Sequence, residues 1–134
     1  LMYNELTIIP SEISGLTALK DLILSGNQLT SLPPEIGELT ALEVLSLGSN
    51  KLTALPPEIG ELTSLRRLSL ESNRLAALPF EILRLRVLKI LRLKNNQLTS
   101  LPSSFKRLYT RLEEGEDEVR RLIELKSPTK KIKH

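Results

Sequence analysis

The sequence predicts an α/β solenoid, a stack of similar coils joined by a parallel sheet. Asparagine recurs at a constant step of 23 (27 − 4 = 23), at Asn4, Asn27, Asn50, Asn73 and Asn96. Leucine makes up 31 of the 134 residues, well above its share in an ordinary globular chain. The leucines keep the same period as the asparagines, and self-similarity at a fixed period of about 20 to 50 residues is typical of solenoids.

One unit of the repeat reads L-x-x-L-x-x-L-x-L-x-x-N-x-L-x-x-L-P-x-x-I-x-x, and it occurs four times without insertion. Complete units start near Leu16, Leu39, Leu62 and Leu85, and residues 1–15 match the second part of a preceding unit. The repeats therefore occupy residues 1–108. Because the chain starts in mid-repeat, we expect it to be a fragment of a longer protein, or to have lost its start.

Each unit is predicted to contain a short strand, such as the one around Leu22 and Leu24. These two leucines point inward, and residues 21, 23 and 25 point outward to a concave face. Each asparagine then turns the chain, and its buried amide should bond the backbone of its own turn and of the next coil. The Leu-Pro-Pro-Glu-Ile segment holds too many prolines for a regular helix, so it should run extended and end in a short convex helical turn.

The repeat pattern ends after Leu108, because the next core positions hold Arg111 and Glu114. Apolar spacing predicts a C-terminal helical cap over residues 103–126, with Gly115 breaking or bending it. Within this cap, Val119, Leu122 and Ile123 should cover the last leucine layer. Residues 127–134 are expected to form a flexible basic tail.

The composition argues against most enzyme chemistry. The chain has no cysteine, which excludes a thiol nucleophile and a thiolate metal site, and its single histidine is the last residue, His134. The paired carboxylates Glu35/Glu38 and Glu58/Glu61 recur because the unit recurs, so surface solubility explains them. The acidic run 113–118 lacks the ligand spacing of a calcium loop. We therefore predict no catalytic residue, no metal and no cofactor.

Two classes of partner are also disfavoured. The basic part of the chain is poor in aromatic residues for stacking on bases, with Phe80 alone in residues 62–102, and it has no nucleic-acid motif. No apolar run approaches the roughly 18 residues that a membrane-spanning helix needs. A partner protein is the remaining prediction.

The outward strand positions are the candidate partner-binding residues. Apolar side chains at such positions are not needed for folding, so Ile23, Val44 and Ile90 are either anchors for a partner or strand-forming residues on a half-exposed sheet. The full set of candidates is Asp21, Ile23, Val44, Ser46, Arg67, Ser69, Glu71, Ile90, Arg92 and Lys94.

Charge is distributed unevenly along the repeats. Residues 1–61 carry two basic and eight acidic groups, a net charge of −6, whereas residues 62–102 carry eight basic and two acidic groups, a net charge of +6. This distribution predicts a partner with an acidic surface that meets Arg67 and Arg92; a solvated surface without a binding role is the alternative.

The 23-residue unit with Leu-Pro-x-x-Ile-Gly resembles the intracellular leucine-rich repeats of plant Ras-group-related proteins, Ras-scaffold proteins and many bacterial proteins. The resemblance covers about residues 1–108. It implies a horseshoe whose concave face binds another protein. Extracellular animal relatives usually carry cysteine-rich caps, so their absence here favours a cytoplasmic setting, with a secreted bacterial protein as the alternative.

The resulting functional hypothesis is a protein-interaction module, part of a larger scaffold or regulatory protein. One alternative is a structural spacer within a longer array. Another is a regulatory domain of a GTPase or ubiquitin ligase whose catalytic part is not in this sequence, which contains no G-x-x-x-x-G-K-[ST] loop. The leucines near the start, Leu1, Leu6 and Leu16, are also expected to take part in self-association or partner contact.

Overall fold

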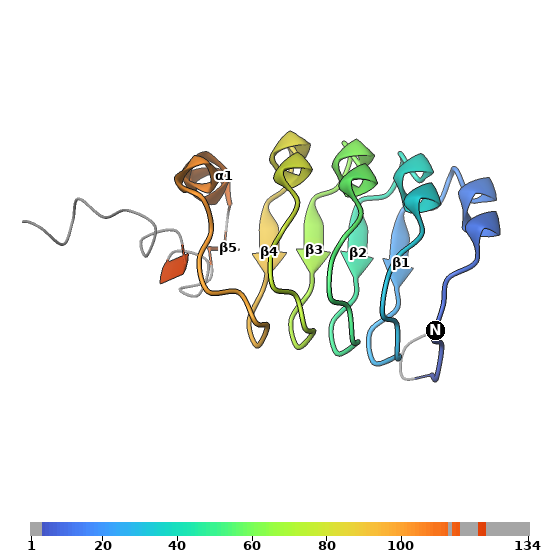
Figure 1. Ribbon diagram of the computed structural model, residues 1–134. Helices are drawn as coiled ribbons and strands as arrows, with labels where there is room; N and C mark the ends of the chain where they lie inside the picture. Colours follow the sequence, from blue (N-terminus) through green and yellow to red (C-terminus); the bar gives the residue numbers. More distant parts are fainter. Residues whose placement is uncertain (1–3, 113, 116–120, 123–134) are drawn as a thin grey trace, which may run out of the picture.

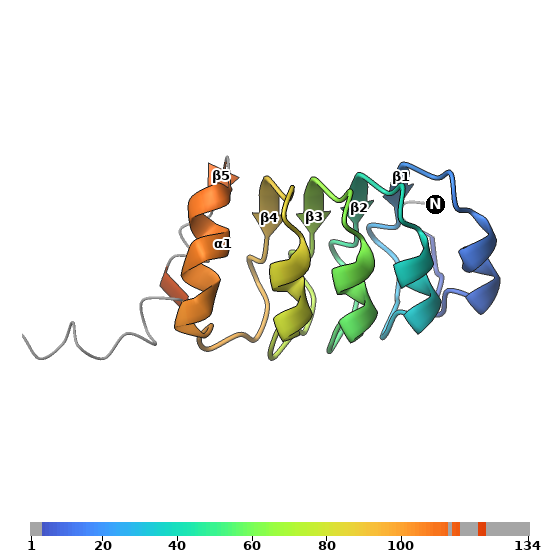
Figure 2. The same cartoon turned by 90° about the horizontal axis from the view of Figure 1, so that it is seen from above.

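The computed structural model describes residues 4–112, 114–115 and 121–122, and it has the predicted solenoid architecture (Figure 1). Short strands lie on one side of the stack and helical turns on the other, as the view from above makes clear (Figure 2). The parallel sheet contains, in sequence order, β1 (Asp21–Ile23), β2 (Val44–Ser46), β3 (Arg67–Ser69), β4 (Ile90–Arg92) and β5 (Glu114–Gly115). The helical turns are η1 (Ser11–Gly15), η2 (Pro34–Glu38), η3 (Pro57–Glu61), η4 (Phe80–Arg84), η5 (Ser103–Phe105) and the α-helix α1 (Lys106–Arg111).

The prolines explain why the convex side forms short 3-10 turns. Pro33 is extended, with φ −73° and ψ 154°, and Pro34 is the first residue of η2. A proline at this first position costs no hydrogen bond, since its N–H would have no partner within the helix. The turn then ends at Glu38, where the N–H of Leu39 bonds the carbonyl of Ile36. The expected extended run followed by a convex turn is therefore present.

The leucines fill the space between the sheet and the turns. Leu45, Leu47, Leu68 and Leu70 are completely buried, and the isoleucines of η2, η3 and η4, such as Ile59, are buried with them. Because each coil repeats the same positions one period later, these side chains form continuous layers along the axis. The core therefore lies between neighbouring coils, and every coil depends on the next.

The repeated asparagines link adjacent coils. Asn50 Oδ1 accepts from the N–H of Leu29 at 3.0 Å, and its Nδ2 donates to the carbonyls of Leu24 and Leu47, each at 3.0 Å. Asn73 repeats these bonds one coil later. The inter-coil bonds run to the preceding coil, not to the next coil as expected, because the amide points back along the axis. Asn27 and Asn96 bond the preceding coil in the same way, and Asn4 is exposed.

The segment predicted as a helical cap over residues 103–126 differs from a helix in its middle part. η5 and α1 occupy residues 103–111, but Glu114 and Gly115 form β5, which pairs with β4 in register Ile90↔Glu114. Gly115 therefore lies in a strand and does not bend a helix. After α1 the chain returns to the edge of β4, so the sheet continues. The partners Ile90 and Glu114 are 24 residues apart (114 − 90 = 24), one more than the partners Arg67 and Ile90 (90 − 67 = 23).

Leu122 is the part of the predicted cap that the described residues include. Its side chain is 4% exposed, and its carbonyl accepts from the N–H of Leu101 at 3.0 Å. Val119, Ile123 and the predicted tail 127–134 lie outside the described residues. Leu122 therefore packs on the last leucine layer.

Candidate interaction face

The sheet aligns the outward side chains into columns across the strands. Asp21 pairs with Val44, Val44 with Arg67, and Arg67 with Ile90. The second column contains Ile23, Ser46, Ser69 and Arg92 in the same register. Side chains one repeat apart in sequence are therefore neighbours about 4.8 Å apart on one face.

Apolar and cationic side chains are interleaved on this face. Ile23 is 36% exposed, and Val44 and Ile90 are partly exposed. Arg67 lies exposed between Val44 and Ile90, and Lys94 is exposed two residues after the end of β4. We call Ile23, Val44, Arg67, Ile90 and Lys94 the concave patch.

Ser69 is buried, and Arg92 is only partly exposed. Ser69 is only 4% exposed, and its hydroxyl accepts a long hydrogen bond (3.4 Å) from Nε of Arg67. Ser69 therefore supports the Arg67 side chain and is not placed to touch a partner. Arg92, which was expected to act with Arg67, is partly buried.

Glu71 lies against the preceding coil. A Cβ added to Gly48 would be 3.0 Å from its Cδ, so the carboxylate occupies the space that Gly48 leaves empty. Within the described part of the chain, Oε1 of Glu71 is buried without a hydrogen-bond partner. Asp21 and Ser46, the remaining predicted residues, are exposed and partly exposed respectively.

The uneven charge of the sequence divides the solenoid into an acidic half and a basic half. Because the strands follow sequence order, the acidic coils up to residue 61 precede the basic coils 62–102 along the axis. Arg67 on β3 and Lys94 after β4 bring part of the positive charge to the concave side. An acidic partner surface would be attracted to this half.

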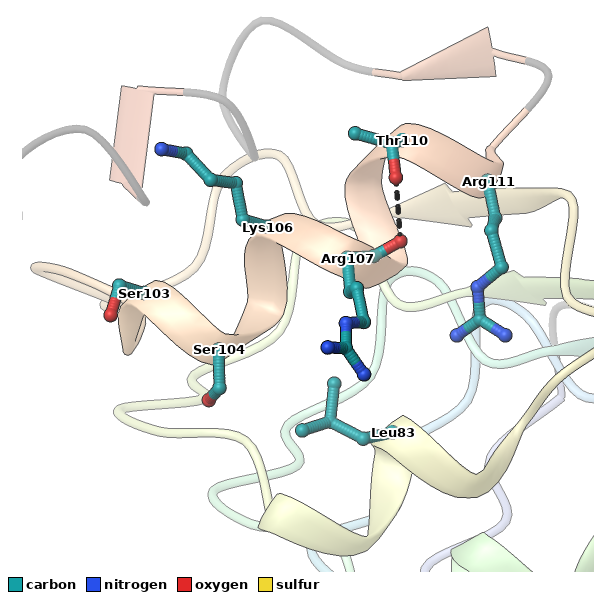
Figure 3. Close-up of a pocket in the computed structure, with 7 residues that line it drawn as sticks. All are labelled: Leu83, Ser103, Ser104, Lys106, Arg107, Thr110 and Arg111. Carbon is teal, nitrogen blue, oxygen red and sulfur yellow. Dashed lines mark hydrogen bonds between the residues drawn. The ribbon is translucent and has the colours of Figure 1, made fainter.

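A groove on the convex side has no counterpart in the sequence analysis. It lies between η4 and α1, has a volume of about 720 Å³ (Figure 3), and is lined by Leu83, Ser103, Ser104, Lys106, Arg107, Thr110 and Arg111. We call it the convex groove. Its signal in the sequence is Leu83, which stands where the two preceding units have Gly60 and Gly37.

The paired carboxylates of the sequence lie on the convex turns, Glu35/Glu38 on η2 and Glu58/Glu61 on η3. Among the described residues, no group of three or more histidine, cysteine, aspartate or glutamate side chains is arranged to hold a metal ion. Of the leucines expected to take part in self-association, Leu16 is 49% exposed and Leu6 is partly buried, while Leu1 lies outside the described residues. That expectation stays a prediction.

Comparison with known proteins agrees with the coil geometry. A family model described as leucine rich repeat matches residues 17–75, and a second of the same description matches residues 87–108. The chain is a leucine-rich repeat protein. Its repeats carry the strand, asparagine turn and convex 3-10 turn described above.

A solved leucine-rich repeat protein of Leptospira interrogans is similar to this one. The two are 45% identical, with a TM-score of 0.75, over 85% of this chain and 29% of that protein. This leucine-rich repeat chain thus spans less than a third of the length of its structural relative. No curated protein matches it. In the described part of the chain, no helix is long and apolar enough to cross a membrane.

Proposed function

We propose that this leucine-rich repeat chain is a protein-interaction module whose partner docks on the concave sheet and presents an acidic surface to β3 and β4. The observation that carries the proposal is the concave patch. Its apolar and cationic side chains lie on or directly after strands whose inward leucines already complete the core. Leucine-rich repeats commonly mediate protein–protein interaction, and the extended concave surface of a solenoid suits this role.

The chemistry of the concave patch supports a protein partner. Val44 and Ile90 flank Arg67 on adjacent strands, so a bound partner would bury aliphatic groups beside the guanidinium. Arginine at the centre of a desolvated contact is a frequent binding hot spot. Arg67 can also hold a carboxylate through two parallel hydrogen bonds.

Charge reversal tests the proposal. Arg67→Glu combined with Lys94→Glu should leave folding nearly unchanged, because both side chains are exposed. Binding to a protein isolated with the wild-type chain should weaken at least tenfold, which corresponds to about 1.4 kcal/mol. The loss should shrink at high salt, because screening removes the electrostatic part.

A convex double variant, Glu58→Lys with Glu61→Lys, is the matched control. It also changes two charges, and it should keep the partner. A concave variant that retains full affinity, while the Glu58/Glu61 variant loses it, would place the contact on the convex side and refute the proposal.

A further inference from the structure

Leu83 lines the convex groove and stands where the two preceding turns have a closely packed glycine. A Cβ on Gly37 would lie 2.8 Å from the carbonyl oxygen of Glu58, and one on Gly60 would lie 2.6 Å from that of Glu81. At Gly37 and Gly60 the following turn therefore leaves no room for a side chain. The equivalent residue of η1 is the small Ser14, and η1 still packs on η2. Leu83 occupies the next equivalent position, and the residue that it would meet by the same spacing is Ser104.

The packing of the convex side changes at this point. η1 to η4 lie side by side in close contact, whereas η4 has few contacts with η5 and α1. Figure 2 shows α1 standing farther from η4 than the preceding turns stand from one another. The resulting groove is bordered by Leu83 on η4 and by residues 103–111.

The charges that line the groove have one sign. Lys106, Arg107 and Arg111 line it, and no carboxylate among the described residues does. In Figure 3, Arg107 and Arg111 extend from α1 toward η4, with Arg107 close to Leu83. The exposed Arg84 of η4 does not line this groove; with Arg86 and Glu61 it lines a second hollow next to η3.

A hydrogen bond holds one arginine of the groove in place. Arg111 Nη1 donates to the carbonyl of Arg86 at 3.3 Å, which holds this guanidinium between α1 and the chain that follows η4. Nε of Arg111 is buried, with no hydrogen-bond partner in the described ranges. Thr110 Oγ1 donates to the carbonyl of Arg107 at 2.8 Å within α1. Arg107 has an exposed side chain and is available for a ligand.

We propose that the convex groove is a second docking site, which binds an extended, acidic segment of another protein. Carboxylates of the segment pair with Arg107 and Lys106, and an aliphatic part of the segment contacts Leu83. Charge complementarity selects this occupant, since the lining offers cations and hydroxyls around one apolar side chain. This site is independent of the concave patch and goes beyond the function proposed above.

The test uses the full chain and a fluorescent ten-residue peptide of alternating glutamate and alanine. Fluorescence anisotropy should show binding at least tenfold tighter than that of the matched glutamine–alanine peptide. Lys106→Glu with Arg107→Glu should weaken binding of the acidic peptide at least tenfold. Arg67→Glu with Lys94→Glu, the concave double variant, should change it less than twofold.

Three outcomes would overturn the proposal: equal binding of both peptides, retention of the acidic peptide by the convex variant, or its loss in the concave variant alone. Displacement of the acidic peptide by a thymidine oligonucleotide of matched length at lower concentration would also overturn it, by showing that the groove prefers nucleic acid. If the double variant fails to fold, Arg107→Gln tests the same contact, with a loss of at least threefold expected. Failure of this site leaves the concave proposal intact, because that proposal is tested by binding of a protein isolated with the wild-type chain, not by binding of the peptide.

Discussion

Asn50 and Asn73 carry the hydrogen bonds that join one coil to the next. Each is 7% exposed, and each satisfies one N–H and one carbonyl of the preceding coil together with a carbonyl of its own. These backbone groups are in the turn after the strand, beyond the reach of the sheet ladder. The side chain therefore replaces the hydrogen bonds that water would otherwise make.

Asn50→Ala should lower the free energy of unfolding by about 2 to 3 kcal/mol, because the Leu29 N–H and two carbonyls lose their partner in a buried place. Urea unfolding followed by circular dichroism measures this change. Gln97→Ala, at an exposed position, is the control and should cost less than about 0.5 kcal/mol. A cost below about 1 kcal/mol for Asn50→Ala would contradict the role of the asparagines in joining the coils.

The residue before each of these asparagines adopts a left-handed backbone. Ser49, Ser72 and Asn95 have φ between 57° and 60°, and Gly26 at the equivalent position has φ 74°. This conformation costs a side-chain-bearing residue roughly 1 to 2 kcal/mol. Only Gly26 adopts it without that cost.

Ser49→Gly should raise the free energy of unfolding by about 0.5 to 1 kcal/mol, since relief of this strain exceeds the added freedom of the unfolded chain. Ser46→Gly, in strand β2, should lower it, because glycine weakens a strand. Thermal unfolding of both variants measures the two changes in stability. A lower melting temperature for Ser49→Gly would show that the backbone strain is absent.

Two glycines allow neighbouring convex turns to pack closely against each other. Gly37 and Gly60 are buried, and each faces the carbonyl of the following turn at a distance that leaves no room for a methyl group. The equivalent residue of η1 is Ser14; Gly15, one residue later, has no described heavy atom within 4 Å of an added Cβ. The close approach of η2 to η3 and of η3 to η4 thus leaves no room for a side chain at Gly37 and Gly60.

Gly60→Ala should destabilise the chain by about 1 to 3 kcal/mol, because η3 and η4 must separate to admit the methyl group. Gly15→Ala should be neutral or slightly stabilising. Equilibrium unfolding of the two variants compares the same chemical change in a crowded and an open place. Equal effects would mean that the turns do not constrain one another.

Stability of the whole stack depends on its last layer, since each coil is supported only by its neighbours. Leu122 packs on this layer and bonds Leu101 through its carbonyl. Loss of this contact should propagate from the C-terminal coils toward the centre. The basic coils and the convex groove lie in the region that would be affected.

Leu122→Ala should cost about 2 to 3 kcal/mol and should open the last coils before the others. Hydrogen exchange at the Leu101 amide should accelerate at least tenfold, whereas exchange at Leu45 should change much less. Measurement by nuclear magnetic resonance gives both rates in one sample. Uniform acceleration along the chain would show that the stack unfolds as a single unit.

The fold was predictable from the period of the sequence. Leucine, asparagine and proline recur at one constant step, and each coil contacts only its neighbours, so a local pattern was sufficient to predict the parallel sheet and the convex turns. The outward positions, including Asp21, Val44, Arg67 and Ile90, followed from the alternation of strand side chains.

The tertiary structure alone decided which of these side chains are accessible and where the repeat departs from itself. Ser69 is buried and accepts from Arg67, which alternation cannot reveal because it depends on side-chain conformation. β5 pairs with β4 after α1, in a register one residue later than the 23-residue repeat predicts. The convex groove lies between η4 and α1, where the large Leu83 stands in place of the glycines of η2 and η3, and the close approach of these turns exists only in the folded stack.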